Sequence, residues 1–307
     1  MTFRSGFVTL VGRPNVGKST LVNRMVGSKV AIVSDRPQTT RSQIRGVRTT
    51  PDTQMVLLDT PGIHKPRTLL GERTNERALA TLAEVDVVSM LVEASAPIGR
   101  GDRFIANLVQ QVATPKILVV NKIDLTHRGA VAEHLAVAAA ELGEFDAYVP
   151  LSARTGDGLG GLVEELEARL PEGPHYYPDG VTTDQPEMFL AAELVREQLL
   201  RMAREELPHA ITVVAEEIEP DDDERTAEAD ESDDGDGVLR IRARILVERE
   251  SQKGIVIGRG GAVLKEAGTR ARQELEALLG TRVYLETRVA VERDWQRRAH
   301  ALDRLGY

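Results

Sequence analysis

The sequence predicts an α/β protein in which a doubly wound, mostly parallel sheet is followed by a smaller α+β domain. In the first half, apolar runs of strand length alternate with helical patterns, and several runs end in a Gly-, Asp- or Asn-containing motif. In the second half the predicted order is helix, strand, strand, helix, glycine turn, helix, strand. The 307 residues are enough for two domains of ordinary size, about 100–150 residues each.

Residues 12–19 form a glycine-rich loop between a predicted strand and a predicted helix. They read Gly-Arg-Pro-Asn-Val-Gly-Lys-Ser, after the apolar run 7–11 and before the helical segment 19–26. Such a loop leaves backbone N–H groups at a helix N-terminus, where they can wrap a polyphosphate. Lys18 would then reach the β- and γ-phosphates and Ser19 would bind Mg²⁺. The alternative, a glycine turn that binds nothing, is disfavoured by the flanking strand and helix.

A second motif follows the next predicted strand. The stretch 29–43 is polar and has no helix or strand periodicity, which predicts a mobile loop. The strand 54–58 then ends in Asp59-Thr60-Pro61-Gly62. An aspartate at that place can hold Mg²⁺ through water, and Gly62 would let a backbone N–H approach the γ-phosphate. A simple turn is the alternative for the tetrapeptide alone. Its position, 47 residues after Gly12, favours the phosphate-binding role.

Three more strands are predicted at 86–93, 115–120 and 147–151, with a helix at 103–112. The second of these strands ends in Asn121-Lys122-Ile123-Asp124. The carboxylate of Asp124 can accept hydrogen bonds from the N1–H and 2-amino group of guanine, which adenine lacks. Asn121 would brace the site, the Lys122 stem would cover the base, and the backbone of 152–154 would face the guanine O6. The tetrapeptide alone is weak evidence, but the motifs together are strong, because an open α/β sheet binds ligands at the carboxyl ends of its strands.

The composition changes after residue 170. Residues 171–186 are rich in Pro, Gly, Asp and Tyr, which predicts a linker of restricted flexibility. A helix at 186–206 and strands at 211–218 and 238–247 follow. Between the two strands, residues 219–237 hold eleven acids against Arg225 alone, a local net charge of −10. We predict that this acidic hairpin tip is disordered. A solvated tail, repulsion of RNA and a basic protein partner are the alternatives for its role.

The net charge of −9 conceals a basic C-terminal part. Residues 238–307 contain fifteen Lys and Arg against nine acids, a net charge of +6, which is an electrostatic footprint for nucleic acid. The absence of cysteine excludes disulfides and thiolate metal sites and fits a cytosolic protein. The N-terminus runs straight into the first predicted strand, and no apolar run approaches the roughly 20 residues of a membrane span. We therefore expect neither a signal peptide nor a transmembrane segment.

Residues 258–261 form a G-x-x-G turn between two helical segments. Without side chains in the way, a nucleic-acid backbone can approach the turn, and nearby cations would help it to clamp about four nucleotides. The alternative is a plain helix–turn–helix loop with glycine C-caps, which the surrounding order of elements disfavours. The predicted RNA-binding residues are Lys253, Gly258, Arg259, Gly260, Gly261, Lys265 and Arg270.

With these motifs in one order, residues 5–170 resemble a translational-type P-loop GTPase domain, and the C-terminal order of elements resembles a type II KH domain. Nearly the whole chain resembles the Era family of bacterial ribosome-assembly GTPases. The resemblance is carried by the phosphate loop, the G-x-x-G turn and the stretches 37–41, 59–64, 248–254 and 302–307. It implies a doubly wound P-loop GTPase sheet followed by an α+β KH domain of type II. The expected divisions are a GTPase domain at 1–170, a linker at 171–186 and a KH domain at 187–307.

The resemblance also implies function. It implies a GTP-hydrolysing switch that binds 16S rRNA near its 3′ end and acts in assembly of the 30S ribosomal subunit. GTP or GDP and Mg²⁺ would be its ligands, and we expect a cytoplasmic monomer. Loose peripheral association with the inner face of the cell membrane is suggested as well, although the sequence shows no anchor for it. The implied GTP-binding residues are Gly12, Asn15, Val16, Gly17, Lys18, Ser19, Thr20, Asp59, Gly62, Asn121, Lys122, Asp124, Ser152 and Ala153.

Hydrolysis is expected to depend on Lys18, Thr40 and Gly62, with Mg²⁺ held by Ser19, Thr40 and Asp59. Thr40 is preferred to its neighbour Thr39 because it directly precedes Arg41, as in related switch loops.

One departure from the family pattern and one further resemblance bear on the mechanism. Ile63 stands where Ras-like GTPases have the glutamine that orients the attacking water, and an aliphatic side chain cannot do so by hydrogen bonding. We therefore expect slow turnover that depends on a partner, an ordered water or a monovalent cation. Asn15 resembles the asparagine that binds K⁺ in related GTPases, and loop capping is the alternative for it.

Two other functions stay open at this point. In one, the chain is an RNA chaperone for which GTP is mainly a structural ligand. In the other, it is a cell-cycle or membrane signalling GTPase whose KH domain binds protein.

Overall fold

The computed structural model describes residues 2–36, 39–203, 207–220 and 238–307, without the side chains of 217–220. The chain divides into two compact units, one of residues 1–184 with Tyr307 and the other of residues 185–306. Most of the acidic segment for which disorder is predicted, residues 221–237, lies outside the described residues. Among the described residues, no helix is both long enough and apolar enough to cross a bilayer.

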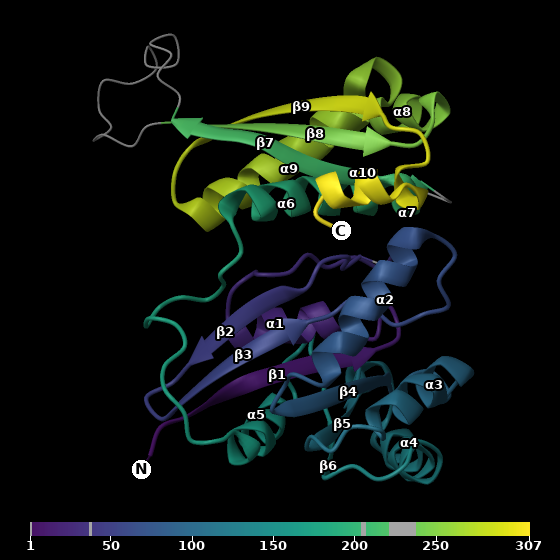
Figure 1. Cartoon of the computed structure of the whole chain (residues 1–307), viewed down its shortest axis with the longest axis vertical. Coiled ribbons are helices and arrows are strands. Elements are labelled where there is room, and N and C mark those ends of the chain that lie inside the picture. Colours follow the sequence, from purple (N-terminus) through teal and green to yellow (C-terminus); the bar gives the residue numbers. More distant parts are fainter. Residues whose placement is uncertain (1, 37–38, 204–206, 221–237) are drawn as a thin grey trace. The chain divides into compact units, whose positions relative to one another are not determined.

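The first unit contains a six-stranded sheet in the order β2-β3-β1-β4-β5-β6 (Figure 1). Its strands are parallel except β2, which pairs antiparallel with β3. The strands are β1 Arg4–Gly12, β2 Ile44–Thr49, β3 Thr53–Asp59, β4 Val87–Glu93, β5 Lys116–Asn121 and β6 Ala147–Pro150. The helices are α1 Lys18–Val26, α2 Leu69–Leu82, α3 Arg100–Val109, α4 Arg128–Glu141 and α5 Leu159–Arg169. The doubly wound α/β fold predicted from the sequence is confirmed.

Alternate residues of each central strand pack on opposite faces of this sheet. In β4, Val87 and Leu91 belong to a core with residues of α1 and α5, whereas Val88 and Met90 belong to a second core with residues of α2, α3 and α4. Both faces are therefore covered by helices, which is why the strands form almost uninterrupted apolar runs in the sequence. Strand β2, absent from our sequence prediction, forms the edge beside β3.

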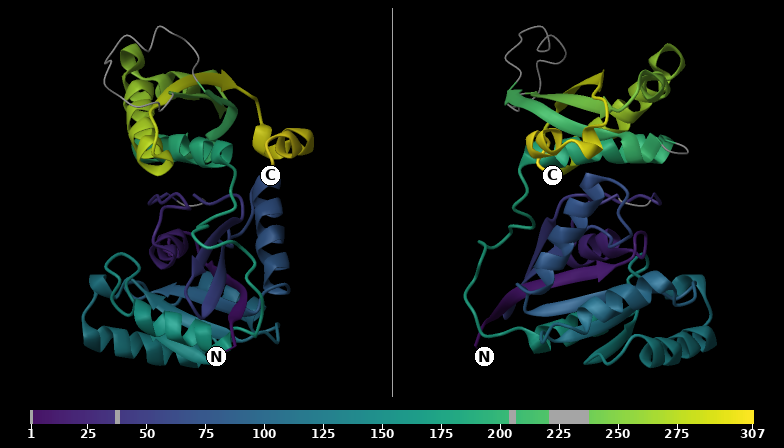
Figure 2. Two further views of the ribbon diagram at one scale, coloured as in Figure 1. Left: turned by 90° about the vertical axis from the view of Figure 1, so that its left-hand side faces the viewer. Right: turned by 45° about the vertical axis from the view of Figure 1, so that its right-hand side comes forward.

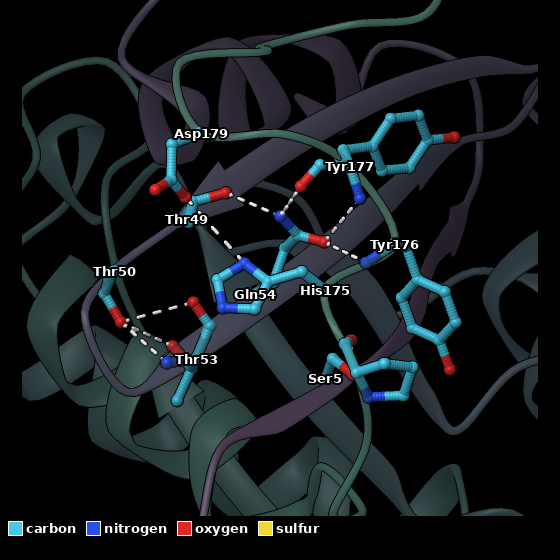
Figure 3. A network of polar contacts seen from close by, with 10 residues as sticks. Ser5, Thr49, Thr50, Thr53, Gln54, His175, Tyr176, Tyr177 and Asp179 are labelled. Carbon is cyan, nitrogen blue, oxygen red and sulfur yellow. Dashed lines mark hydrogen bonds and ion pairs between the residues drawn. The ribbon is translucent and has the colours of Figure 1, made fainter.

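Residues 171–184, which follow α5, belong to the first unit and are hydrogen-bonded to its sheet. We call this segment the strap; it passes close to the N-terminus of the chain (Figure 2). The N–H of Ser5 donates to the carbonyl of Pro171 at 3.0 Å, and the N–H of Val47 on the β2 edge donates to the carbonyl of Thr182 at 2.8 Å. Between these two attachments the strap is held by the side chain of Gln54 (Figure 3).

The second unit contains a three-stranded sheet in the order β7-β8-β9. Strand β8 pairs antiparallel with β7 and parallel with β9. Ile241, Ala243 and Ile245 of β8 are buried, and the sheet packs against α6 and α9. The elements are α6 Glu187–Met202, α7 Leu207–Ala210, β7 Thr212–Pro220, β8 Leu239–Val247, α8 Glu250–Ile257, α9 Ala262–Leu279, β9 Val283–Val291 and α10 Ala299–Arg304. Apart from the short α7 and α10, this is the predicted order of elements.

Candidate functional site

The phosphate loop lies between β1 and α1. Gly17 has φ +100° at the N-cap of α1, and a Cβ there would lie 2.2 Å from Nδ2 of Asn121, so only glycine fits. Asn15 also has a positive φ, and its side-chain amide donates to the carbonyl of Asp35 at 2.7 Å. In this structure the Asn15 side chain joins the phosphate loop to residue 35, and loop capping and K⁺ binding both stay predictions for it.

Lys18 is almost fully buried at the start of α1. Its Nζ donates to the carbonyl oxygens of Gly12 at 3.3 Å and Arg13 at 3.1 Å, so the side chain folds back over the loop. Burial lowers the pKa of Lys18 to about 8, and the nearby carboxylate of Asp59 opposes that shift. Because a buried ammonium whose hydrogen-bond partners are carbonyl oxygens lacks a paired counter-charge, binding of an anion such as a phosphate would stabilise it.

Three oxygen-bearing side chains meet beside the loop. The Ser19 hydroxyl donates to Oδ2 of Asp59 at 2.6 Å, and the Thr40 hydroxyl donates to the same oxygen at 3.2 Å. The two hydroxyl oxygens are 3.0 Å apart. Burial raises the pKa of Asp59, and its other oxygen, Oδ1, is buried with no hydrogen-bond partner among the described residues.

This donor set fits Mg²⁺. Mg²⁺ prefers hard oxygen ligands and retains several waters, and an unpartnered carboxylate oxygen would accept one of them. The hydroxyl of Thr39, by contrast, donates to the carbonyl of Arg36 at 2.7 Å. Of the two threonines considered in the sequence, the geometry thus places Thr40 beside Ser19 and Asp59.

The base-recognition motif lies at the carboxyl end of β5. Asn121 donates to the carbonyl of Val16 at 2.8 Å and accepts from the N–H of Ala153 at 2.9 Å, so one buried amide joins the phosphate loop to the last strand's loop. Asp124 accepts from the Ser152 hydroxyl and from Arg154, each at 2.6 Å. The Ser152 hydrogen bond and the charge of Arg154 lower the pKa of Asp124, which keeps this carboxylate ionised as an acceptor.

A cavity of about 530 Å³ connects these motifs. Eleven predicted residues line it: Asn15, Gly17, Lys18, Ser19, Thr20, Thr40, Gly62, Asn121, Lys122, Asp124 and Ala153. The predicted Gly12, Val16, Asp59 and Ser152 do not line the cavity. Asp59 and Ser152 are buried, and each is hydrogen-bonded to a residue that does line the cavity, Ser19 and Asp124 respectively.

Some of the residues that line this cavity were not predicted from the sequence. The lining residues that sequence reasoning did not consider for this site are Ile32, Val33, Ser34, Asp35 and Leu125, whereas Pro14, Thr39 and Arg154 belong to stretches that it did consider. Residues 32–35 belong to the polar loop with no periodicity, where no motif marks a contact. Their nearness to the phosphate loop could have been suspected only from Asn15, whose side chain holds Asp35.

Gly62 lies against the phosphate loop, whereas its neighbour Ile63 points away from the cavity. A Cβ at Gly62 would lie 2.7 Å from the backbone nitrogen of Pro14. The Ile63 side chain is 3% exposed and packs in the core that includes Ala78 and Leu82 of α2. The position that Ras-like GTPases use to orient water is therefore part of the hydrophobic core here.

The second unit has a groove of about 360 Å³ beside the G-x-x-G turn. Of the predicted RNA-binding residues, Gly261 and Lys265 line it, together with Leu264, Gly268, Thr269, Arg272, Leu285 and Thr287. Gly258, Arg259 and Gly260 form the turn at its end, and Lys253 lies on the preceding α8. Arg270 instead forms an ion pair with Glu266 at 2.6 Å. Arg272, which sequence reasoning missed, lines the groove about two turns beyond Lys265 on the same face of α9.

Comparison with known families gives two matches along the chain. Residues 7–122 match the model of a family described as 50S ribosome-binding GTPase, and residues 206–296 match the KH domain model. The first match covers the phosphate loop and the base-recognition motif up to Lys122. The second covers the strands of the second unit and the G-x-x-G turn.

Individual relatives match over the full length. The chain is 50% identical to the GTPase Era of Nocardioides sp. (strain ATCC BAA-499 / JS614), covering 99% of this chain and 96% of the relative. It is 48% identical to the GTPase Era of Mycobacterium sp. (strain KMS), covering 99% of both.

Two solved structures also match with a TM-score of 0.92, 39% identity and 99% coverage of both chains. One is Era in complex with MgGDPNP and nucleotides 1506–1542 of 16S ribosomal RNA. The other is a variant of Aquifex aeolicus Era bound to GDP·AlF₄⁻.

Proposed function

Since the chain belongs to the Era family of GTPases, we propose that it is a GTP-hydrolysing switch that binds the 3′ end of 16S rRNA through its KH domain during assembly of the 30S subunit. One observation carries this proposal. The cavity of the first unit joins phosphate, metal and base motifs in one space, while the second unit presents a G-x-x-G turn at the end of a separate groove. The proposed place of action is the cytoplasm, where ribosomal subunits are assembled.

The residues of the cavity divide the work of binding GTP. The backbone N–H groups of residues 15–19 and the Lys18 ammonium neutralise the β- and γ-phosphates. Ser19, Thr40 and Asp59 would hold Mg²⁺, which when bound would supply further neutralisation of charge on the transferring phosphoryl group. Asp124 accepts hydrogen bonds from the N1–H and 2-amino group of guanine, for which Arg154 would release the Oδ2 atom of Asp124 that it contacts in this structure.

Hydrolysis on this site is in-line attack of water on the γ-phosphorus. The backbone N–H of Gly62 donates to the γ-phosphate, and the Lys18 ammonium stabilises charge that develops on the leaving β–γ bridge. Because Ile63 is in the core, no side chain of that position orients the water. Slow turnover without an activator is the consequence, and loss of the γ-phosphate releases the loops that carry Thr40 and Gly62.

The RNA groove is proposed to hold a single strand. The glycines of the turn let the phosphate backbone approach, while Lys253, Arg259 and Lys265 supply positive charge around it. Arg270 and Arg272 are ion-paired with Glu266 and Glu276, so each would exchange that partner for a phosphate. Gly260 has φ +61°, and a Cβ there would meet no atom within 4 Å. Gly260→Asp therefore places a negative charge at the turn in a conformation that aspartate tolerates, without a steric clash.

The test is to cross-link the protein to RNA in cells lysed with a GTP analogue or with GDP, and to sequence what is bound. We expect the 16S 3′ end to be recovered with the GTP analogue and to be lost with Gly260→Asp. Equal recovery with both nucleotides would remove the switch from the proposal. Recovery of no rRNA by the unaltered protein would remove the RNA target.

A further inference from the structure

The loop that carries Gly62 has no regular secondary structure between the end of β3 and the start of α2. Its position therefore depends on side-chain contacts. At its start the Thr60 hydroxyl donates to the carbonyl of Leu10 at 2.7 Å, and Gly62 packs against Pro14. Beyond Gly62, the buried side chain of Ile63 fixes one point of the loop in the core under α2.

Asn75, nearly two turns into α2, holds the backbone of His64, the residue after Ile63. Its Nδ2 donates to the carbonyl of His64 at 2.6 Å, and its Oδ1 accepts the N–H of His64 at a longer 3.4 Å. The ring of His64 in turn lies with Nδ1 2.8 Å from the carbonyl of Gly62, to which a protonated Nδ1 donates. A continuous series of hydrogen bonds thus runs from Asn75 through His64 to Gly62.

Asn75 itself does not line the nucleotide cavity, whereas Gly62 does. Asn75 therefore has no direct route to substrate and can act only through the loop. With Ile63 unable to orient water, the loop's contribution to hydrolysis rests on where its backbone N–H groups point. Backbone donors accelerate a reaction only when they are held close to the developing charge.

We propose that Asn75 is a positioning residue for GTP hydrolysis, which fixes the backbone of His64 and thereby the Gly62 N–H against the γ-phosphate. The inference rests on the hydrolysis step of the proposed function. Asn75 would differ in its effect from the residues that bind GDP and GTP alike, because it acts through Gly62 and GDP has no γ-phosphate for Gly62 to contact. Loss of the Asn75 clamp should change the rate of hydrolysis and leave GDP affinity as it was.

The variants are Asn75→Ala and Asn75→Asp in the full chain, with Thr68→Ala as the matched control. Thr68 is the N-cap of α2, where its hydroxyl accepts the N–H of Gly71 at 3.2 Å. Removing that cap weakens the start of the same helix without touching His64. Single-turnover GTP hydrolysis, GDP affinity and thermal unfolding are measured for each protein.

We expect Asn75→Ala to lower the single-turnover rate by about tenfold or more, with GDP affinity unchanged to within about twofold. Asn75→Asp should lower the rate at least as much, because its carboxylate oxygen would face the His64 carbonyl without a proton to donate. Thr68→Ala should lower the unfolding temperature and hydrolyse GTP at close to the unaltered rate.

Two results would overturn the proposal. One is hydrolysis by Asn75→Ala at the unaltered rate. The other is an equal loss of rate in Asn75→Ala and Thr68→Ala, which would show that only the stability of α2 matters. If the unaltered protein hydrolysed no GTP under any condition, the proposed function would fail first, and that outcome is distinguished by the absence of any rate to compare.

Discussion

Gln54 provides a direct test of how the strap is attached. Its side chain is fully buried on β3 and uses all of its hydrogen-bonding capacity (Figure 3). Oε1 accepts the N–H groups of Tyr176 at 2.7 Å and Tyr177 at 3.0 Å. Nε2 donates to the carbonyl of Tyr177 and to the hydroxyl of Thr49, each at 2.9 Å. One side chain thus supplies the hydrogen bonds to the strap's backbone N–H and carbonyl groups that a neighbouring strand would otherwise make.

Gln54→Leu keeps a similar volume and removes all four hydrogen bonds. Each bond contributes about 1 kcal/mol net, and each buried partner left unpaired costs about 1–3 kcal/mol. The strap's partners are only partly buried, so water recovers some of that cost. We expect the free energy of unfolding of the first unit to fall by about 3 kcal/mol, with faster amide exchange in residues 171–184.

The assay is urea unfolding of the full chain, in which the transition of the first unit is the one that added GDP shifts to higher urea. Gln110→Leu is the matched control, because Gln110 donates to two carbonyls, those of Leu142 at 3.3 Å and Glu144 at 2.9 Å, at a partly exposed position. It should cost no more than about 1 kcal/mol. If Gln54→Leu proved as mild as Gln110→Leu, the strap would not depend on Gln54.

Three further predictions concern the nucleotide site. Bound phosphates should raise the pKa of Lys18 above its value of about 8, so that GDP binding takes up a proton above pH 8 and weakens as pH rises further. Calorimetry in two buffers of different ionisation enthalpy measures this proton uptake, and equal heats of binding in the two buffers would contradict it. Asp124→Asn should weaken GTP binding by about a hundredfold and improve binding of xanthosine triphosphate, measured by competition. Gly17→Ala, whose Cβ would lie 2.2 Å from Asn121, should cost about 1–3 kcal/mol of GDP affinity by titration, and retained affinity would show that the loop can shift.

The elements that sequence reasoning found are those whose signal is local. The phosphate loop, the Asp59 strand end and the Asn121 motif each combine an apolar run with a short polar sequence, and the structure places all three around one cavity. The G-x-x-G turn was found for the same reason, because its glycines lie within one short stretch of sequence. In the structure all three of them adopt positive φ.

Strand β2 was missed because its stability is tertiary. Its sequence Ile-Arg-Gly-Val-Arg-Thr carries two arginines and a glycine, which weaken any strand pattern. Gly46 is required by packing, because a Cβ there would lie 2.7 Å from a methyl of Val26 in α1. Pairing with β3 on one side and the strap on the other supplies what the local sequence lacks.

The strap illustrates the opposite case, in which composition was informative but incomplete. Proline, glycine and paired tyrosines predicted a linker of restricted flexibility, yet the contacts that restrict residues 171–184 come from Ser5, Gln54 and Val47, more than 100 residues away in the chain. The same holds for the clamp of Asn75 on His64 and for the ion pair of Arg13 with the buried Asp102, at 2.7 Å. No periodicity or motif in a single sequence reveals such pairs.

In the proposed switch, the nucleotide bound by the first unit controls RNA binding by the second unit. The most direct measurement is the affinity of the full chain for an RNA with the sequence of the 16S 3′ end, by fluorescence anisotropy, with GDPNP and with GDP at one salt concentration. We expect at least about tenfold tighter binding with GDPNP, a coupling of about 1.4 kcal/mol. Equal affinities in the two nucleotide states would contradict it.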